Sequence, residues 1–152
     1  MSTPDIERLL ASVPTGLWIG GVERPGSSQF DVLDPSNDQV LISVANATAD
    51  DAIAALDAAC AVQAEWAATP ARERGEILRS VFETIIERAD DLAALMTLEM
   101  GKVFAESMGE VKYGAEFFRW FAEEAVRIGG RFTASPAGNG RIIVTKSPVG
   151  PC

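Results

Sequence analysis

The 152-residue chain contains no histidine, one tyrosine and only two cysteines, Cys60 and Cys152. Without histidine, these residues cannot form a Ser–His or Cys–His nucleophile pair, a histidine general base or a histidine-ligated zinc site. Two cysteines do not make a disulfide framework either. The amino acids present therefore offer little catalytic chemistry of their own.

Basic residues are also scarce, because 13 Lys and Arg stand against 22 Asp and Glu, for a net charge of −9. This charge, together with the lack of a Lys/Arg cluster, argues against binding to a nucleic-acid backbone. No apolar run approaches the roughly 20 residues that a membrane-spanning helix needs. The first residues lack the basic-then-apolar layout of a secretory signal. We expect no nucleic-acid partner, no membrane partner and a cytoplasmic location.

Apolar residues are abundant, at 47% of the chain, with 23% charged residues, which is typical of a globular protein. Near the amino terminus, the pattern predicts a short helix over residues 6–12, before Pro14. Short apolar runs bounded by Gly, Pro and Asp then predict strands and turns that form a hairpin-like arm. The predicted strands are residues 17–22, 30–33 and 40–44.

From Thr48 onward the apolar spacing changes to that of amphipathic helices. Thr48 is a favoured N-cap residue, and Asp51 stands at the capping-box position three residues later. These signals predict a helix to about Ala68 with one buried seam. The expected seam residues are Ile53, Leu56, Cys60 and Ala67.

Two shorter helical segments are predicted next. We expect Pro70 at the first position of a helix whose wide apolar stripe, from Ile77 to Ile86, is buried on one side. A further helix is expected to begin near Asp90 and to stop at Gly101.

The longest predicted element is a helix from about Val103 to Ile128, with an apolar seam in alternating steps of four and three. Gly109 and Gly114 inside it each cost about 1 kcal/mol relative to Ala, which predicts close packing there. The seam comprises Phe104, Met108, Val111, Ala115, Phe118, Ala122 and Ala125.

The last residues combine a Gly-rich loop, 133–140, with a β-branched strand over Arg141–Lys146. This strand has no predicted neighbour in the sequence, and an unpaired edge is unfavourable. It therefore pairs back with the amino-terminal strands, or the natural chain continues. The expected fold is mostly helical, with a small antiparallel sheet and a terminal strand.

Several segments, in this order, resemble the aldehyde dehydrogenase superfamily. Leu98-Glu99-Met100-Gly101-Lys102 is similar to the family's Leu-Glu-x-Gly-Lys box and is the most specific of them. Trp120-Phe121-Ala122-Glu123-Glu124-Ala125 is similar to the succinate-semialdehyde branch. The other matching segments are Trp18-Ile19-Gly20-Gly21, Phe30-Asp31-Val32-Leu33-Asp34-Pro35 and Pro148-Val149-Gly150.

The resemblance implies an α/β parent chain several times longer, with a Rossmann-like cofactor domain, a catalytic domain and a β-arm that exchanges between subunits. Residues 1–140 would be the amino-terminal part of the cofactor-binding domain, and residues 141–152 the start of the oligomerisation strand. The cofactor sheet and the catalytic domain would lie outside this chain. The implied cofactor is NAD or NADP, and the implied assembly is a homodimer or homotetramer.

The implied chemistry is the oxidation of succinate semialdehyde to succinate, with another semialdehyde such as glutarate semialdehyde, or a general aldehyde, as the alternative. In this family a thiolate attacks the aldehyde to give a thiohemiacetal, and an Asn amide and a backbone N–H stabilise the oxyanion. Hydride then passes to the nicotinamide, and a Glu activates water. By resemblance, these residues follow position 152. No catalytic or cofactor-binding residue is therefore assigned here, and the chain alone is expected to be inactive.

The resemblance also implies two sites within the chain. Gly109, Glu110 and Tyr113 would lie near the substrate entrance, with core packing as the alternative, which is favoured for Phe117 and Phe118. Glu99, with the backbone carbonyls of Val32 and Leu33, would hold a structural monovalent cation, since hard oxygen ligands suit such an ion. The alternative for Glu99 is an ordinary solvated carboxylate.

Three further interpretations concern the cysteines, the last strand and the protein class. Cys60 and Cys152 are expected to be inert, buried thiols. Arg141–Lys146 is expected to belong to the subunit-exchanging arm, with an intrachain edge strand as the alternative. If the natural chain ended at residue 152, a helical interaction module without enzymatic activity would be the alternative function.

Overall fold

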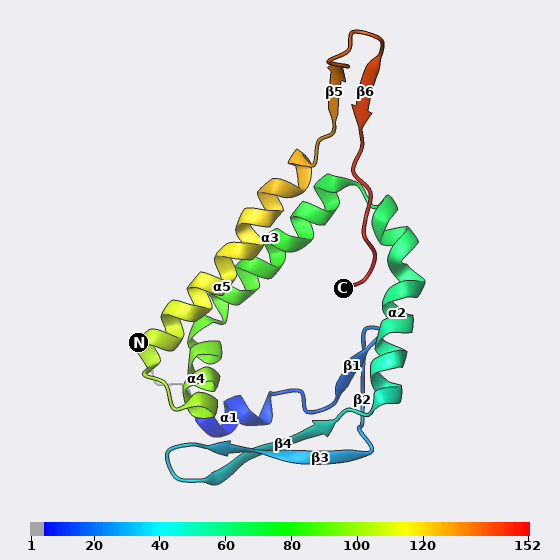
Figure 1. Ribbon diagram of the computed structural model, residues 1–152. Coiled ribbons are helices and arrows are strands. Elements are labelled where there is room, and N and C mark those ends of the chain that lie inside the picture. Colours follow the sequence, from blue (N-terminus) through cyan, green and yellow to red (C-terminus); the bar gives the residue numbers. More distant parts are fainter. Residues whose placement is uncertain (1–4) are drawn as a thin grey trace.

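The computed structural model describes residues 5–152 (Figure 1). Its helices are α1 (Ile6–Ala11), α2 (Ala49–Ala68), α3 (Ala71–Glu87), α4 (Ala89–Met100), α5 (Phe104–Glu124) and the 3-10 helix η1 (Ala125–Arg127). Its strands are β1 (Leu17–Ile19), β2 (Val22–Arg24), β3 (Ser28–Asp34), β4 (Gln39–Asn46), β5 (Arg131–Ala134) and β6 (Arg141–Val144). The strands form three separate two-stranded antiparallel sheets. The predicted mostly helical chain with small antiparallel sheets is confirmed.

The elements are arranged around an open frame in Figure 1. The antiparallel helices α3 and α5 form one side, α2 forms the other side, and the β3–β4 hairpin closes the lower end. The β5–β6 hairpin projects from the upper end, beyond the point where α2 leads into α3. The chain therefore packs as a helical layer with attached hairpins and not as a closed two-layer domain.

The first hairpin corrects the prediction of one strand over residues 17–22. β1 and β2 pair through Ile19 and Val22, and the two residues between them form the turn. Gly20 and Gly21 have φ values of 64° and 80°, as a two-residue type I′ turn requires. The glycine pair therefore reverses the chain instead of interrupting a strand. The β3–β4 hairpin, in contrast, follows the predicted strands, with a register shift between Val32 and Leu33.

Helix α2 starts and ends as predicted, at Ala49 and Ala68. The backbone amide of Asp51 donates to the Thr48 hydroxyl at 3.2 Å, and the Thr48 amide donates to the Asp51 carboxylate at 2.8 Å, so the capping box is complete. The predicted buried seam is wrong, however, because none of residues 49–68 is buried. The physical reason is that, among the described elements, α2 makes its main contact with the short strand β1.

Helices α3 and α5 cross at a close contact that depends on Gly75. Gly75 is the buried residue of α3, and a Cβ placed on it would lie 2.8 Å from the Ala122 carbonyl oxygen. Glycine at this point lets the two backbones approach each other. The predicted close packing at Gly109 and Gly114 is wrong, since among residues 5–152 no atom other than those of the adjoining α5 backbone and chain neighbours lies within 4 Å of a Cβ built at either position. Pro70 is the N-cap of α3 and not its first helical residue.

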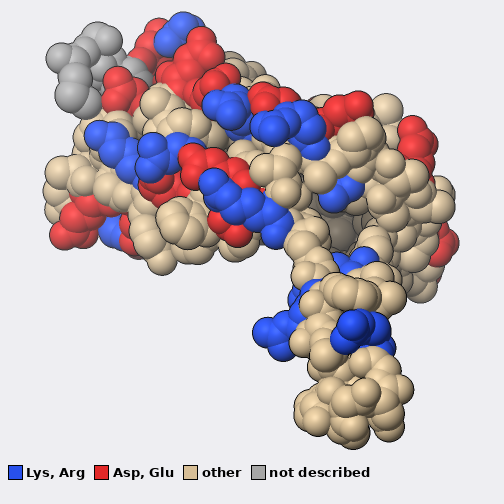
Figure 2. All heavy atoms as spheres, turned by 90° about the horizontal axis from the view of Figure 1, so that it is seen from above, with Lys and Arg blue, Asp and Glu red and all other residues tan. Residues whose placement is uncertain are grey.

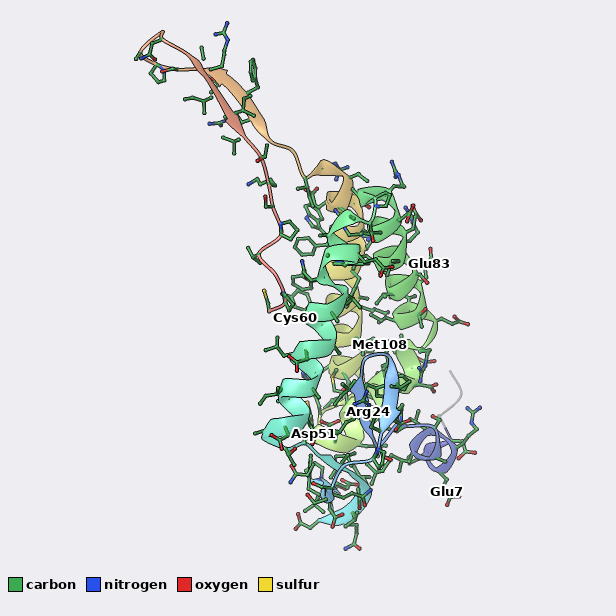
Figure 3. The ribbon with its side chains drawn as sticks, turned by 90° about the vertical axis from the view of Figure 1, so that its right-hand side faces the viewer. Glu7, Arg24, Asp51, Cys60, Glu83 and Met108 are labelled. Atoms are coloured by element: carbon green, nitrogen blue, oxygen red, sulfur yellow. The ribbon has the colours of Figure 1, made fainter. Side chains whose placement is uncertain are left out.

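A small core lies between α4 and α5. Ala89, Ala93 and Val111 are its buried members, and Met108, labelled in Figure 3, packs against them. The buried Ser107 hydroxyl is 2.9 Å from the Thr97 hydroxyl, which satisfies both polar groups. Gly101 ends α4 with φ 70°, as predicted. The other side chains that pack on this core are Ile85, Leu92, Met96 and Phe104.

Many apolar side chains that were predicted to be buried are exposed. On α3, Ile77 and Ile86 are exposed, and the stripe between them is at most half-buried. On α5, Val111 and Ala115 of the predicted seam are buried, but Phe117 and Phe118 are 49% and 37% exposed, so the described residues alone do not pack them into a core. Periodicity identified the apolar faces correctly. The described residues supply too few partners to cover them.

The carboxyl-terminal region contains a strand that the sequence did not predict. β5 (Arg131–Ala134) overlaps the expected loop and pairs antiparallel with β6, from Arg131–Val144 to Ala134–Arg141. The prediction that the last strand lacks a neighbour in the sequence is therefore wrong. Every residue of both strands is exposed. Separately, none of the helices within residues 5–152 is both long and apolar enough to cross a bilayer.

Replacement of Gly75 by alanine is expected to lower the thermal unfolding midpoint, because the added methyl group meets the Ala122 carbonyl oxygen. Overpacking of this kind costs about 1–3 kcal/mol. The matched control is Gly109→Ala on α5, which meets no described atom and should gain about 0.5–1 kcal/mol from helix propensity. Circular dichroism of the protein on heating checks both; equal shifts of the same sign would refute the close contact.

Removal of the Thr48 hydroxyl is expected to raise the pKa of Asp51. Hydrogen bonds from the Thr48 side chain and backbone amide hold that pKa below its usual value. Since the folded-state pKa is depressed, the interaction stabilises the protein above the unfolded-state pKa and is lost as the pH falls through the folded-state pKa. An NMR titration of the Asp51 carboxyl carbon in Thr48→Val checks this. An unchanged pKa would show that the hydroxyl has no effect on the carboxylate.

Candidate functional site

The predicted entrance residues lie together on the first half of helix α5. Gly109, Glu110 and Tyr113 are all exposed, and Tyr113 is 68% exposed. The Tyr113 ring contacts the Phe117 ring edge to face, with centroids 5.1 Å apart, so the phenol is held by an aromatic neighbour one turn along the helix. The structure thus presents these side chains on one accessible helix surface, where a small molecule can reach them. Their role at a substrate entrance stays a prediction.

Glu110 borders a hollow between α4 and α5. The hollow has a volume of about 610 Å³ and is lined mainly by apolar side chains, including Leu95, Met96 and Phe118. Two carboxylates also line it, Glu110 from α5 and Glu99 from α4. An apolar recess edged by a few charged groups is the usual form of a small-molecule site. The sequence spacing did not predict that Glu99 and Glu110 line the same hollow, because they belong to different helices.

Glu110 forms an ion pair with Lys102, which lies in the connection between α4 and α5. The Lys102 side chain is only 22% exposed, while that of Glu110 is 52% exposed. The lysine stem is therefore covered by protein, and its ammonium group reaches the carboxylate. This pair was missed at the sequence level because the two residues are eight positions apart and are separated by a helix start.

The predicted cation ligands lie on neighbouring elements. Strand β3, which carries Val32 and Leu33, contacts α4, which carries Glu99, and a Cβ on Gly101 would lie 3.0 Å from Pro35 Cγ. In the turn that follows Val32 and Leu33, hydrogen bonds from the hydroxyl and the backbone amide of Ser36 hold the pKa of Asp34 below its usual range. Glu99 is exposed. A cation at these residues stays a prediction.

The described residues do not fit a dinucleotide cofactor. Such cofactors bind where a parallel strand leads through a glycine-rich turn into a helix amino terminus. Within residues 5–152, all strand pairs are antiparallel, and they belong to three separate hairpins. None of these described residues is therefore assigned to a nicotinamide cofactor.

The β5–β6 hairpin differs in charge from the rest of the chain. Residues 125–152 contain Arg127, Arg131, Arg141 and Lys146 and no acidic residue, so the preceding residues hold the other nine cations and all 22 anions. Figure 2 shows blue but no red atoms on the projecting hairpin, whereas red atoms are spread over the body. Phe132 and Ile143 are each 69% exposed on the hairpin. The hairpin thus offers a cationic and apolar surface.

Both cysteines are exposed, so the predicted burial of Cys60 and Cys152 is wrong. Cys60, labelled on α2 in Figure 3, lies on the helix that lacks buried residues. The physical reason is the missing cover for α2, since the alanine-rich seam was identified correctly but has no helix packed against it among the described elements. Within residues 5–152, no group of three or more Cys, Asp or Glu side chains is arranged to hold a metal ion.

Curated relatives of known activity match most of this chain. It is 56% identical over 113 residues to succinate-semialdehyde dehydrogenase of Paenarthrobacter nicotinovorans, covering 74% of this chain and 25% of that protein. It is 47% identical over 135 residues to the NADP(+) succinate-semialdehyde dehydrogenase of Escherichia coli (strain K12), covering 89% and 27%. The chain therefore spans about a quarter of the length of these relatives.

The fold and the family model agree with these matches. The crystal structure of succinate-semialdehyde dehydrogenase from Burkholderia pseudomallei superposes with a TM-score of 0.83 at 40% identity, over 88% of this chain and 28% of that one. The model of the Aldehyde dehydrogenase family matches residues 22–152. The resemblance seen in the Leu-Glu-x-Gly-Lys box and its neighbours is thereby confirmed: this chain belongs to the aldehyde dehydrogenase family.

Proposed function

We propose that this chain is the amino-terminal segment of an NAD(P)-dependent aldehyde dehydrogenase that oxidises succinate semialdehyde to succinate. The observation that carries the proposal is the 56% identity to a relative named for that activity. In the overall reaction, the aldehyde and water give the acid, and hydride passes to NAD(P)+, which becomes NAD(P)H. A cytoplasmic location remains a prediction.

The segment acts in this proposal as a scaffold for chemistry supplied by the rest of the polypeptide. The chain contains no histidine to activate a thiol, and within residues 5–152 every strand pair is an antiparallel hairpin. The catalytic cysteine, its oxyanion-stabilising Asn and the water-activating Glu would belong to the part of the parent that this chain does not include. Residues 1–140 would then extend the cofactor-binding domain, and the exposed apolar faces of α2 and α5 support this, because large exposed apolar surface is a sign of a buried interface.

The entrance to the catalytic centre would be bordered by Gly109, Glu110 and Tyr113. Their common exposure on α5 supports this assignment, as does the adjoining apolar hollow. Gly109 leaves room beside the helix, and Tyr113 offers a hydroxyl at the end of an apolar ring. A small aldehyde with a polar tail matches such a surface.

The substrate assignment predicts a chain-length preference in the full-length enzyme. The value of kcat/KM is expected to be about tenfold or more higher for succinate semialdehyde than for glutarate semialdehyde, since one methylene group changes binding by about 1–3 kcal/mol. Formation of NAD(P)H, followed by absorbance with each cofactor in turn, checks this. The 152-residue chain alone is the control and should form none. A preference for glutarate semialdehyde would favour the alternative semialdehyde, and a preference for butanal would refute a semialdehyde substrate.

The assembly proposed for the parent is a homodimer or homotetramer in which the β5–β6 hairpin contacts another subunit. An isolated two-stranded hairpin is only marginally stable in water, and every residue of β5 and β6 is exposed. A partner surface would cover Phe132 and Ile143, and the four cations of residues 125–152 would suit an acidic subunit.

Replacement of Ile143 by aspartate is expected to dissociate the full-length oligomer, because it places an acidic group in the apolar part of the hairpin. Light scattering coupled to size-exclusion chromatography checks the molar mass. The matched control is Asn139→Asp, which adds the same charge at the tip between the strands and should leave the mass unchanged. An intact oligomer in Ile143→Asp would show that the hairpin is an intrachain edge and not a subunit contact.

A further inference from the structure

The Lys102–Glu110 ion pair differs from the other ion pairs among the described residues. The remaining three join residues three positions apart along the chain, and their cationic side chains are 55–60% exposed. Such exposed pairs contribute little to stability. Lys102, in contrast, reaches from the α4–α5 connection to α5, and its side chain is only 22% exposed. Its ammonium group is therefore held in place beside one particular carboxylate.

Because of where Glu110 lies, its ion pair with Lys102 affects how charged ligands approach. Glu110 and Glu99 are the two acidic groups on the rim of the apolar hollow between α4 and α5. Low-dielectric walls strengthen the field of such groups relative to water. If Glu110 were unpaired, two negative charges would face any anion that approaches this surface. With Lys102 beside it, Glu110 adds no net charge.

We propose that Lys102 is a positioning residue that acts through Glu110 on the approach of a charged substrate. By neutralising Glu110 at the entrance surface, it allows an aldehyde that itself carries a carboxylate to approach. This inference rests on the proposed function, because it assumes an anionic semialdehyde and an entrance at Glu110. It assigns a role in discrimination between charged and neutral substrates, and no role in the chemical step.

The test is a set of charge variants in the full-length enzyme. Lys102→Met leaves Glu110 negative and is expected to raise KM for succinate semialdehyde by about two- to fivefold at low ionic strength. Glu110→Gln leaves Lys102 positive and is expected to lower KM for the same substrate. The double variant carries neither charge and is expected to return KM close to that of the unaltered enzyme.

Two controls separate charge from structure. Butanal has the same carbon number but no carboxylate, so its KM should not follow the charge series. Lys112→Met removes a lysine that has no ion-pair partner among residues 5–152 and is the matched control for net charge. The effect of Lys102→Met should also fade at about 0.5 M salt, where the Debye length falls to a few ångström.

The outcomes that would overturn the role of Lys102 differ from those that would overturn the proposed function. If Lys102→Met and Glu110→Gln impair both substrates alike, or if the double variant is as impaired as the single ones, the pair only ties the α4–α5 connection to α5. A failure of the proposed function is seen instead in the unaltered enzyme, as a preference for butanal. In that case inhibition by succinate replaces KM as the measure, and an inhibition constant that ignores the charge series would overturn the inference on its own.

Discussion

The close approach of α3 to α5 at Gly75 determines how the rest of the chain can be arranged. At this point the Ala122 carbonyl leaves no space for a Cβ, so the two helix backbones lie nearly in contact. Helix α4 follows α3 through a short connection and packs on α5 around Ala93 and Val111. The three helices thereby form one layer, which carries the exposed residues Gly109, Glu110 and Tyr113 on α5 and the connection that holds Lys102. Strand β3 of the second amino-terminal hairpin contacts this layer at α4, whereas the carboxyl-terminal hairpin projects away from it (Figure 1).

The sequence predicted local structure well and tertiary burial poorly. Thr48 and Asp51 fixed the start of α2, and Gly101 fixed the end of α4, because caps depend on a few adjacent residues. The type I′ turn at Gly20 and Gly21 was missed because a short apolar run has the same pattern whether it forms one strand or two strands joined by a tight turn. Strand β5 was missed because Thr133 and Ala134 precede a Pro–Gly-rich loop whose turn signals dominated the pattern. Apolar periodicity shows which face of a helix is apolar but does not identify the partner, so the α2 seam around Cys60 was predicted to be buried and is exposed.

The candidate site also combines residues that the sequence predicted with a contact that only the structure shows. Gly109, Glu110 and Tyr113 could be assigned only through the family resemblance, and the structure adds that they share one exposed surface beside an apolar hollow. The ion pair between Lys102 and Glu110 could not be predicted, because it depends on the path of the chain after Gly101 turns it out of α4. Membership of the aldehyde dehydrogenase family rests on the whole length of the match, residues 22–152.

The three-helix layer is also contiguous in sequence, since α3, α4, α5 and η1 follow one another within residues 71–127, separated only by residue 88 and residues 101–103. Contacts between sequence neighbours close small loops and form quickly, while contacts between distant segments form slowly. Residues 71–127 would therefore fold together as a unit soon after they leave the ribosome during translation. Helix α2 has no buried residue and the projecting hairpin is exposed throughout, so their apolar side chains stay uncovered by this unit, which makes the nascent chain a natural client for chaperones that shield apolar surfaces.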